Sequence, residues 1–473
     1  MPVQSHFTFE NTSQVKVPED PIERVIGQEH VIGIARIVAK QRRHLLLVGP
    51  PGTGKSFIAN TISALLPPPS SQVEVYQNIN EPHRPILRVR NREEVLSERR
   101  QHSNARLVDP RDVPYYVSER LGFRCRKCGT ISDPESNICL YCGAEKYYRN
   151  RNFEDMFSAT PRLTKDDKVL MRKTNQKGEE EEIVYERHGS KVKVYKSMEN
   201  RLGTMRKVIV SLERKTFVQA TGASESELLG DVMHDPYGGH PEIGIPPHER
   251  IVPGAIHEAH EGVLFIDELS TLGELQRYIL TAMQDKKFPI IGRNATSTGA
   301  IIRVDNVPCD FMLIGAVNIN DVPHILPPLR SRIIGSGYEV LLNTVMEDNE
   351  KNREKMAQFI AQEIQKDGRI PHATASACEC ILNESRIRAR QMDGKDGLTL
   401  RLRDLSGIIK MAGDIAIVDG AEFIDTEHVM SALKRARSIE EQLMDDYGSV
   451  WRAGMSDYAS FSRKRKDSVS EVR

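Results

Sequence analysis

Eight residues near the N-terminus have the composition of a loop that holds phosphate groups. An apolar run over 45–48 predicts a buried strand before this loop, and residues 56–66 predict a helix after it. Glycines in that context let backbone amides converge on phosphate oxygens at the positive end of a helix. Lys55 would reach the β and γ phosphates of ATP, and the Ser56 hydroxyl would bind Mg²⁺. The loop consists of Gly49, Pro50, Pro51, Gly52, Thr53, Gly54, Lys55 and Ser56.

A second motif supplies carboxylates. An apolar run over 263–266 ends on Asp267 and Glu268. Such a run is typical of a central parallel strand whose carboxyl end opens into a ligand crevice. Asp267 would hold Mg²⁺ through water, and Glu268 would polarise the attacking water as a general base. Strands ending on two acids are common for structural reasons alone, but the preceding phosphate loop favours a catalytic role.

A third apolar run and a pair of arginines extend the predicted site. The run over 310–317 predicts a strand that ends on Asn318, whose amide could hydrogen-bond the γ-phosphate or the lytic water. An Asn in this position is also a common turn former. Arg330 and Arg332 follow beside an apolar residue. A guanidinium there suits contact with a neighbouring subunit's nucleotide, because it can stabilise charge in the transition state.

These elements, in this order, resemble the AAA+ ATPases. Further segments are similar to the ATPase module of archaeal-type (B-type) Lon proteases, and the likeness covers residues 20–68 and 217–447. The segments that carry it are 217–237, 248–257, 288–292, 307–311, 329–333, 398–405 and 413–416.

The resemblance implies a role for each matching residue. Lys55 would bind phosphate, Asp267 the metal, and Glu268 the lytic water, while Asn318 would be the first sensor of the γ-phosphate. For the arginine that acts on a neighbour's nucleotide, Arg330 is the first choice and Arg332 the second.

Two more assignments follow from the same resemblance. Arg403 is the preferred second sensor, with Arg401 as the alternative. Residues 25–28, including Ile26 and Gly27, match the segment that borders the adenine.

The implied fold is α/β, with a parallel AAA+ sheet sandwiched by helices and an all-helical lid. Apolar residues at helical spacing near 348–367, 373–390, 402–418 and 427–445 predict the lid. The predicted divisions are a core over 1–68 and 217–342, an insertion over 69–216, a lid over 343–447 and a flexible basic tail over 448–473.

Four cysteines in the insertion predict a structural zinc site. Cys125 and Cys128 form one Cys-x-x-Cys pair, and Cys139 and Cys142 form another, each followed by glycine. Two such knuckles place four thiolates tetrahedrally on Zn²⁺ and leave no open position for catalysis. Disulfides are the alternative, and they fit an intracellular ATPase poorly. We therefore expect a zinc ribbon over 120–145.

The rest of the insertion predicts short β elements. Residues 183–186 and 191–195 alternate as a hairpin around a glycine turn, and 208–212 predict a strand that returns to the core. Basic clusters near 99–100, 124–127 and 149–151 flank the ribbon. They could bind nucleic acid, but a solvated surface or a protein-docking face is favoured.

Composition is that of a soluble intracellular protein. The 473 residues carry 66 basic and 66 acidic side chains, so no net charge points to nucleic acid or a membrane surface. The sequence has no apolar run of membrane-spanning length and no secretory signal, which predicts a cytoplasmic protein without membrane contact. Archaeal-type Lon enzymes usually carry transmembrane helices in the interval where this chain has its cysteines.

Two functions compete. The favoured one is a homohexameric ring that spends ATP to unfold or remodel proteins, with the ribbon recruiting a substrate or adaptor and Tyr237 as a candidate gripping residue. If the chain is complete, the polar residues after the lid are too few for the peptidase domain of a Lon enzyme, and the ring would act alone or feed a separate peptidase. The alternative is a nucleic-acid motor or loader that uses the ribbon to bind DNA or RNA.

Overall fold

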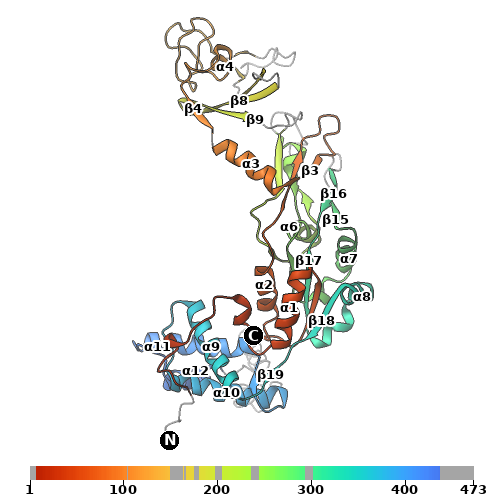
Figure 1. The fold of residues 1–473 in the computed structure, drawn as a ribbon, viewed down its shortest axis with the longest axis vertical. Helices are drawn as coiled ribbons and strands as arrows, with labels where there is room; N and C mark the ends of the chain where they lie inside the picture. Colours follow the sequence, from red (N-terminus) through yellow and green to blue (C-terminus); the bar gives the residue numbers. More distant parts are fainter. Residues whose placement is uncertain are drawn as a thin grey trace, which may run out of the picture.

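The computed structural model describes most of the chain. The described residues are 7–103, 105–146, 148–149, 163–164, 167–174, 180–197, 205–235, 244–292 and 302–436. Tyr237, the end of the last predicted lid helix and the basic tail lie outside them. Figure 1 shows an elongated arrangement, with a helical bundle at one end, a sheet with helices in the middle, and the cysteine-bearing insertion at the far end.

The central element is a five-stranded parallel sheet. Its order is β11 (Phe217–Gln219), β14 (Val263–Ile266), β17 (Met312–Val317), β1 (His44–Val48) and β18 (Gly337–Leu341). Every neighbouring pair runs parallel. Strand β17 therefore lies between the strand that leads into the phosphate loop and the strand that leads into the two carboxylates.

Helices cover both faces of this sheet because its strands are apolar on both sides. Leu45 and Leu47 of β1 pack with α1 (Glu29–Gln41) and α2 (Lys55–Ala64). Leu46 and Val48 point to the opposite face. That face is covered by α5 (Glu225–Leu229), α6 (Ala255–Glu258), α7 (Leu275–Asp285) and α8 (Pro327–Ser336). Each fully buried leucine contributes roughly 1.5–3 kcal/mol. The predicted sandwich is confirmed.

The lid consists of four helices. They are α9 (Glu350–Asp367), α10 (Ala375–Asp393), α11 (Leu402–Val418) and α12 (Thr426–Arg435), with a short pair formed by β19 (Val345–Met346) and β20 (Leu398–Thr399). Two of these helices start with side-chain caps: Asn349 before α9 accepts from the amide of Asn352, and Thr374 before α10 accepts from that of Ala377. These caps fix where α9 and α10 begin, and the predicted helical lid is confirmed.

The N-terminal segment also lies on the lid. Its short helix η1 (Thr12–Gln14) is tied there by a hydrogen bond from the Thr12 amide to the Ala373 carbonyl, 2.9 Å. Phe7 and Phe9 pack against the apolar interior of the lid. The next short helix is η2 (Pro21–Arg24), just before α1. The sequence assigned this segment to the core, and no local pattern indicates its attachment to the lid.

Small antiparallel sheets connect the core to the insertion. A three-stranded sheet has the order β10 (Arg206–Val210), β2 (Ser71–Tyr76) and β3 (Ile86–Asn91). The predicted returning strand is thus present, but it pairs with β2 rather than with the parallel sheet. After α7, β15 (Lys287–Ile291) and β16 (Arg303–Pro308) form an antiparallel pair. Strand β12 (Asp231–Val232) pairs with β13 (Ile251–Val252), which follows η4 (Pro247–Arg250).

The outer part of the insertion is a second antiparallel unit. Helix α3 (Arg92–Ser103) leads to a sheet of order β4 (Arg106–Val108), β9 (Lys191–Ser197), β8 (Glu180–His188) and β7 (Lys168–Thr174). The predicted hairpin is β8–β9, although its turn is only Gly189 and Ser190. Helix α4 (Tyr115–Arg120) precedes the cysteines, and β5 (Tyr148–Arg149) pairs with β6 (Leu163–Thr164). Among the described helices, none is long and apolar enough to cross a bilayer.

Candidate nucleotide site and cysteine cluster

The register of the parallel sheet brings three sequence motifs to one edge. Val48 of β1 lies beside Val317 of β17, and Ile266 of β14 lies beside Gly315. The Gly49 amide continues the pairing with a 3.1 Å hydrogen bond to the Val317 carbonyl. Because parallel strands end together, the phosphate loop, the two carboxylates and Asn318 share one crevice.

The phosphate loop is shaped by glycines in conformations that side chains disfavour. Gly52 and Gly54 have φ of +83° and +87°. Thr53 closes the turn by donating its hydroxyl to the Pro50 carbonyl at 2.9 Å. Helix α2 begins immediately afterwards at Lys55. The loop amides and the helix start therefore present a concentration of positive partial charge, which suits an anion.

Lys55 is buried and already hydrogen-bonded within the loop. Its Nζ donates to the carbonyls of Gly49 (2.7 Å) and Pro50 (3.1 Å) and to Oδ1 of Asn318 (3.3 Å). Burial lowers the pKa of Lys55 below its ordinary value, and Arg403 lowers it further, while Asp267 acts in the opposite direction. An arriving phosphate would replace these neutral acceptors with a negatively charged partner for the ammonium group.

The carboxylates lie directly past the end of β14. The amide of Asp267 donates to the Thr221 hydroxyl at 3.2 Å, and the amide of Glu268 donates to Oδ1 of Asp267 at 3.1 Å. Glu268 has a φ of +53°, a left-handed conformation that costs a non-glycine residue of order 1 kcal/mol or more. This conformation turns its side chain away from the strand, and the carboxylate is exposed in the crevice. The neighbouring Asn318 amide donates to Asp321 at 3.3 Å.

A cavity of about 700 Å³ joins this crevice to the lid. Its volume falls within the range of small-molecule sites. The sequence prediction missed several of its residues, which come from η2, α2, β11, α9 and α11. The missed lining residues are Arg24, Phe57, Ile58, Asn60, Phe217, Gln219, Phe359, Gln362, Glu363, Lys366, Leu402, Ser406 and Lys410. The only sequence signal was polar side chains at helical spacing on otherwise apolar lid helices.

The two candidate second sensors differ in their surroundings. Arg403 lines the cavity, and its backbone and Cβ lie so near the phosphate loop that a Cβ built at Gly52 would be 3.3 Å from Arg403 Cβ. Arg401 instead forms an ion pair with Asp393, with an Nη2–Oδ1 distance of 2.8 Å. The preferred candidate is the one that faces the cavity.

The two candidate trans-acting arginines also differ. Arg330 binds Glu339 of β18 through two nitrogens, at 2.6 and 3.3 Å. Arg332 is exposed, and within the described part of the chain its guanidinium forms no ion pair. Arg332 is therefore the one available to another subunit without breaking an existing contact.

The segment expected to border the adenine lies between core and lid. Ile26 is buried within the apolar cluster of the lid and lines the cavity. Gly27 has a φ of +67°, and a Cβ there would lie 2.3 Å from a methyl carbon of Leu400. Gln28 exchanges two hydrogen bonds with the backbone of Asn343, at 2.8 and 3.0 Å. These contacts make the apolar wall of the cavity and hold the lid against it.

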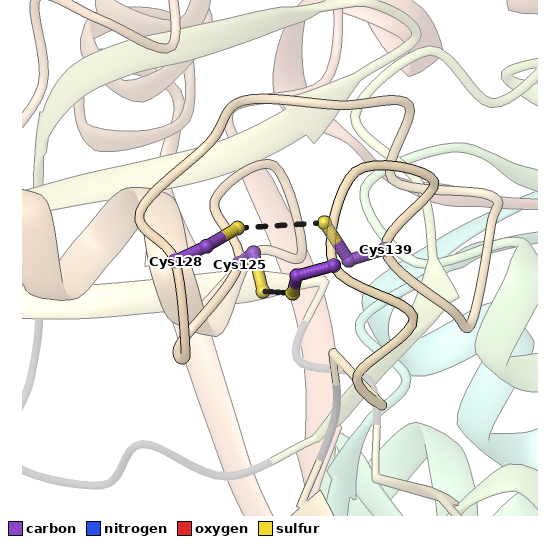
Figure 2. Close-up of side chains that lie close together, drawn as sticks. Cys125, Cys128 and Cys139 are labelled. Atoms are coloured by element: carbon purple, nitrogen blue, oxygen red, sulfur yellow. Dashed lines mark hydrogen bonds between the residues drawn. The ribbon is translucent and has the colours of Figure 1, made fainter.

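The four cysteines of the insertion form a compact cluster. Their sulfur atoms all lie within 4.8 Å of one another, and Sγ of Cys125 and Cys142, like Sγ of Cys128 and Cys139, are 3.6 Å apart. Figure 2 shows these sulfur atoms directed toward a common centre. All four thiols are free. Zn–S bonds of about 2.3 Å in a tetrahedron require sulfur separations of about 3.8 Å, so the cluster fits Zn²⁺.

Each cysteine pair lies on a tight knuckle. The Gly129 amide bonds to the Cys125 carbonyl and the Gly143 amide to the Cys139 carbonyl, both at 2.8 Å. Both glycines adopt positive φ, +72° and +70°. The Lys127 amide points at Cys125 Sγ from 3.4 Å, a contact that stabilises thiolate charge. Of the remaining cysteines, Cys309 and Cys378 are buried and Cys380 is half-buried.

Comparison with known proteins gives the family. Residues 21–101 match the magnesium chelatase family, subunit ChlI, and residues 247–306 match the sigma-54 interaction domain. The chain is 50% identical to a Lon protease homolog of Methanothermobacter thermautotrophicus, over 97% of this chain and 95% of that protein. A homolog from Thermoplasma volcanium is also 50% identical, over 96% and 95% of the two chains.

A longer relative places the chain within a larger group. The archaeal Lon protease of Thermococcus kodakarensis is 38% identical over 93% of this chain, and the match spans 62% of that protein. This match covers a larger part of the chain than residues 20–68 and 217–447 together, so the similarity extends into the insertion. The shared length and identity with the two homologs, together with the AAA+ sheet and lid, show that the chain belongs to the Lon protease homologs of the AAA+ ATPase family.

Proposed function

We propose that this chain is the ATP-hydrolysing motor of a ring that unfolds or remodels proteins. The observation that carries the proposal is the cavity of about 700 Å³ in which Lys55, Asp267, Glu268 and Asn318 from the core meet Arg403 from the lid. Each of these residue types has a distinct use in phosphoryl transfer. Two other cavities, one beside β11 and α5 and one beside β2 and β10, include no residue of the phosphate loop or of the lid.

The chemistry follows from where these side chains lie. The loop amides and Lys55 would bind the phosphates, while Ser56 and Asp267 would hold Mg²⁺, which neutralises charge as it develops on the β and γ phosphates. Glu268 would accept a proton from the attacking water, and Asn318 would orient that water. Arg403 would report the state of the γ-phosphate to the lid, because it lies in the first turn of α11.

Ring assembly would complete the site. Among the described residues, Arg332 is exposed and forms no ion pair, whereas Arg330 is bound to Glu339. We therefore favour Arg332 as the arginine that reaches a neighbour's nucleotide, with Arg330 as a second candidate if the Glu339 pair opens on assembly. A homohexamer is the proposed state of the ring.

The cysteine knuckles would recruit the protein substrate or an adaptor. Their second knuckle exposes three large apolar side chains: Ile138 at 53%, Leu140 at 85% and Tyr141 at 80%. Exposed apolar groups at a structured tip favour contact with a polypeptide. Two nearby arginines lie over tyrosine rings, Arg120 over Tyr116 and Arg124 over Tyr115. These arginine–tyrosine pairs support the alternative function, a nucleic-acid motor, because bases stack on aromatic and arginine side chains.

The two functions are separated by what accelerates ATP turnover. We expect a permanently unfolded protein, such as reduced and carboxymethylated α-lactalbumin, to raise the rate of phosphate release severalfold. Replacing both Leu140 and Tyr141 by Ser should remove that increase and keep the basal rate, because both side chains are solvent-exposed. Asn137→Ser, an exposed polar position on the same loop, is the matched control. Stimulation by DNA or RNA alone, falling steeply with salt, would instead support the nucleic-acid motor.

A further inference from the structure

The strand that ends on the two site carboxylates has an unusual residue at each end. Of the non-glycine residues described, only Arg42, Glu261, Glu268, Lys286 and Asn306 have positive φ. Glu268 follows β14 with φ +53°, and Glu261 precedes it with φ +60°. Such conformations persist only where surrounding contacts hold them. The contacts that hold Glu261 involve the insertion.

The Glu261 carboxylate binds the segment that leaves the core for the insertion. Oε2 accepts the amide of Ser70 at 2.7 Å and the amide of Ser71 at 3.3 Å. Oε1 accepts the hydroxyls of Ser70 at 2.5 Å and Ser71 at 3.0 Å. Ser71 is the first residue of β2 (Ser71–Tyr76), the segment by which the chain leaves the core and which we call the outgoing leg of the insertion. This leg is therefore held where it begins.

The same carboxylate binds the segment that returns. Arg214, between β10 and β11, donates Nη2 to Glu261 Oε2 at 2.8 Å. Its other nitrogens donate to the carbonyls of Ser71 at 2.7 Å, Ser211 at 2.8 Å and His260 at 3.0 Å. The Arg214 side chain is only 8% exposed. One guanidinium thus ties both legs to each other and to the residues before β14, which a lysine could not do with its single nitrogen.

The backbone of Glu261 is bound to the residues that precede β17 and β1 of the parallel sheet. Its amide donates to the Asp310 carbonyl at 2.8 Å, and its carbonyl accepts from Arg42 Nη1 at 2.7 Å. Burial would raise the pKa of Glu261, but the hydrogen bonds from Ser70 and Ser71 outweigh it and lower the pKa to about 2. The carboxylate is therefore ionised in any buffer in which the protein would work, and its bonds are charge-assisted.

We propose that Glu261 is a positioning residue that couples both legs of the insertion to Asp267 and Glu268 through the short strand β14. This coupling rests on the proposed role of those two carboxylates in the nucleotide site. A displacement of either leg would pull on Glu261, and β14 is too short and too completely buried to absorb it locally. In the reverse direction, nucleotide at the carboxyl end of β14 would change the mobility of the legs.

The test is amide hydrogen exchange with and without ATP, in a Glu268→Gln background that retains bound ATP. We expect ATP to slow exchange in the phosphate loop and to change exchange in the two legs, residues 71–76 and 206–212, by about fivefold or more, the low end of typical coupling between sites. Adding Glu261→Gln should preserve the effect of ATP on exchange in the phosphate loop and abolish its effect on exchange in the two legs. Ser70→Ala, which removes only one donor, should reduce the leg response in part.

Glu213→Gln is the matched control, because it makes the same change one residue from Arg214, where the carboxylate pairs with Arg99 in solvent. It should leave the leg response intact. If ATP still changed exchange in the two legs to the same extent after Glu261→Gln, the coupling would be overturned. It would also be overturned if Glu261→Gln made exchange in the legs faster both with and without ATP and left the effect of ATP unchanged. Absence of any ATP effect on the phosphate loop would refute the nucleotide site itself, and the coupling with it.

Discussion

Replacement of Glu268 by Gln is expected to abolish ATP hydrolysis and to spare ATP binding. Gln has nearly the same size as Glu, so the carboxyl end of β14 keeps its shape. The phosphate loop and Lys55 should therefore still hold the nucleotide. The amide cannot accept a proton from water at neutral pH, and loss of a positioned general base typically lowers a rate by about 10²–10⁴-fold. Phosphate release and the binding of a fluorescent ATP analogue measure the two properties separately.

The matched control for this change is Glu274→Gln. Glu274 is exposed just before α7 and pairs with Arg277 on the surface. It should hydrolyse ATP at the normal rate, since surface ion pairs contribute little. Normal turnover in Glu268→Gln would show that another group activates the water. Loss of binding in that variant would show that the carboxylate holds the nucleotide rather than the water.

Removal of zinc is expected to unfold the cysteine knuckles and leave the motor folded. Structural zinc contributes roughly 10–16 kcal/mol of apparent binding free energy in small domains, and its loss usually unfolds them. Elemental analysis should find one zinc per chain, and Cys139→Ser should lose it and become sensitive to proteolysis near 120–146. Basal ATP hydrolysis should persist, because the parallel sheet and lid have their own buried cores.

Cys380→Ser provides the control for the zinc experiment. Cys380 is a half-buried thiol of the lid, outside the cluster, and its replacement should leave the zinc content unchanged. A full complement of zinc in Cys139→Ser would contradict a four-cysteine site. Loss of basal ATP hydrolysis on chelation would make the ribbon part of the motor instead of a separate recruiting element.

The parts of this molecule that the sequence predicts well are those whose determinants are local. The phosphate loop is a strand, a glycine turn and a helix within one short segment. The cysteine knuckles each need only four residues and a glycine. The apolar runs before Asp267 and Asn318 predict buried strands because both faces of each strand are covered by helices.

The parts that the sequence does not predict depend on contacts between distant residues. The ion pair of Arg330 with Glu339 distinguishes the two candidates for the trans-acting arginine, and no sequence pattern near either residue indicates this pair. The lid side chains that line the cavity, such as Gln362 and Lys410, become neighbours of the phosphate loop only when the lid packs on the core. No sequence pattern distinguishes Glu261 from a surface acid, yet its carboxylate binds residues in both legs of the insertion.

The most direct test of the proposed motor is the unfolding of a folded protein. A fluorescent β-barrel protein with a long unstructured extension would be incubated with the purified chain and ATP. We expect its fluorescence to fall with wild-type protein and ATP, and to stay constant with Glu268→Gln or with ADP. Constant fluorescence while the wild-type protein steadily hydrolyses ATP in the presence of this substrate would contradict the proposed coupling of ATP hydrolysis to protein unfolding.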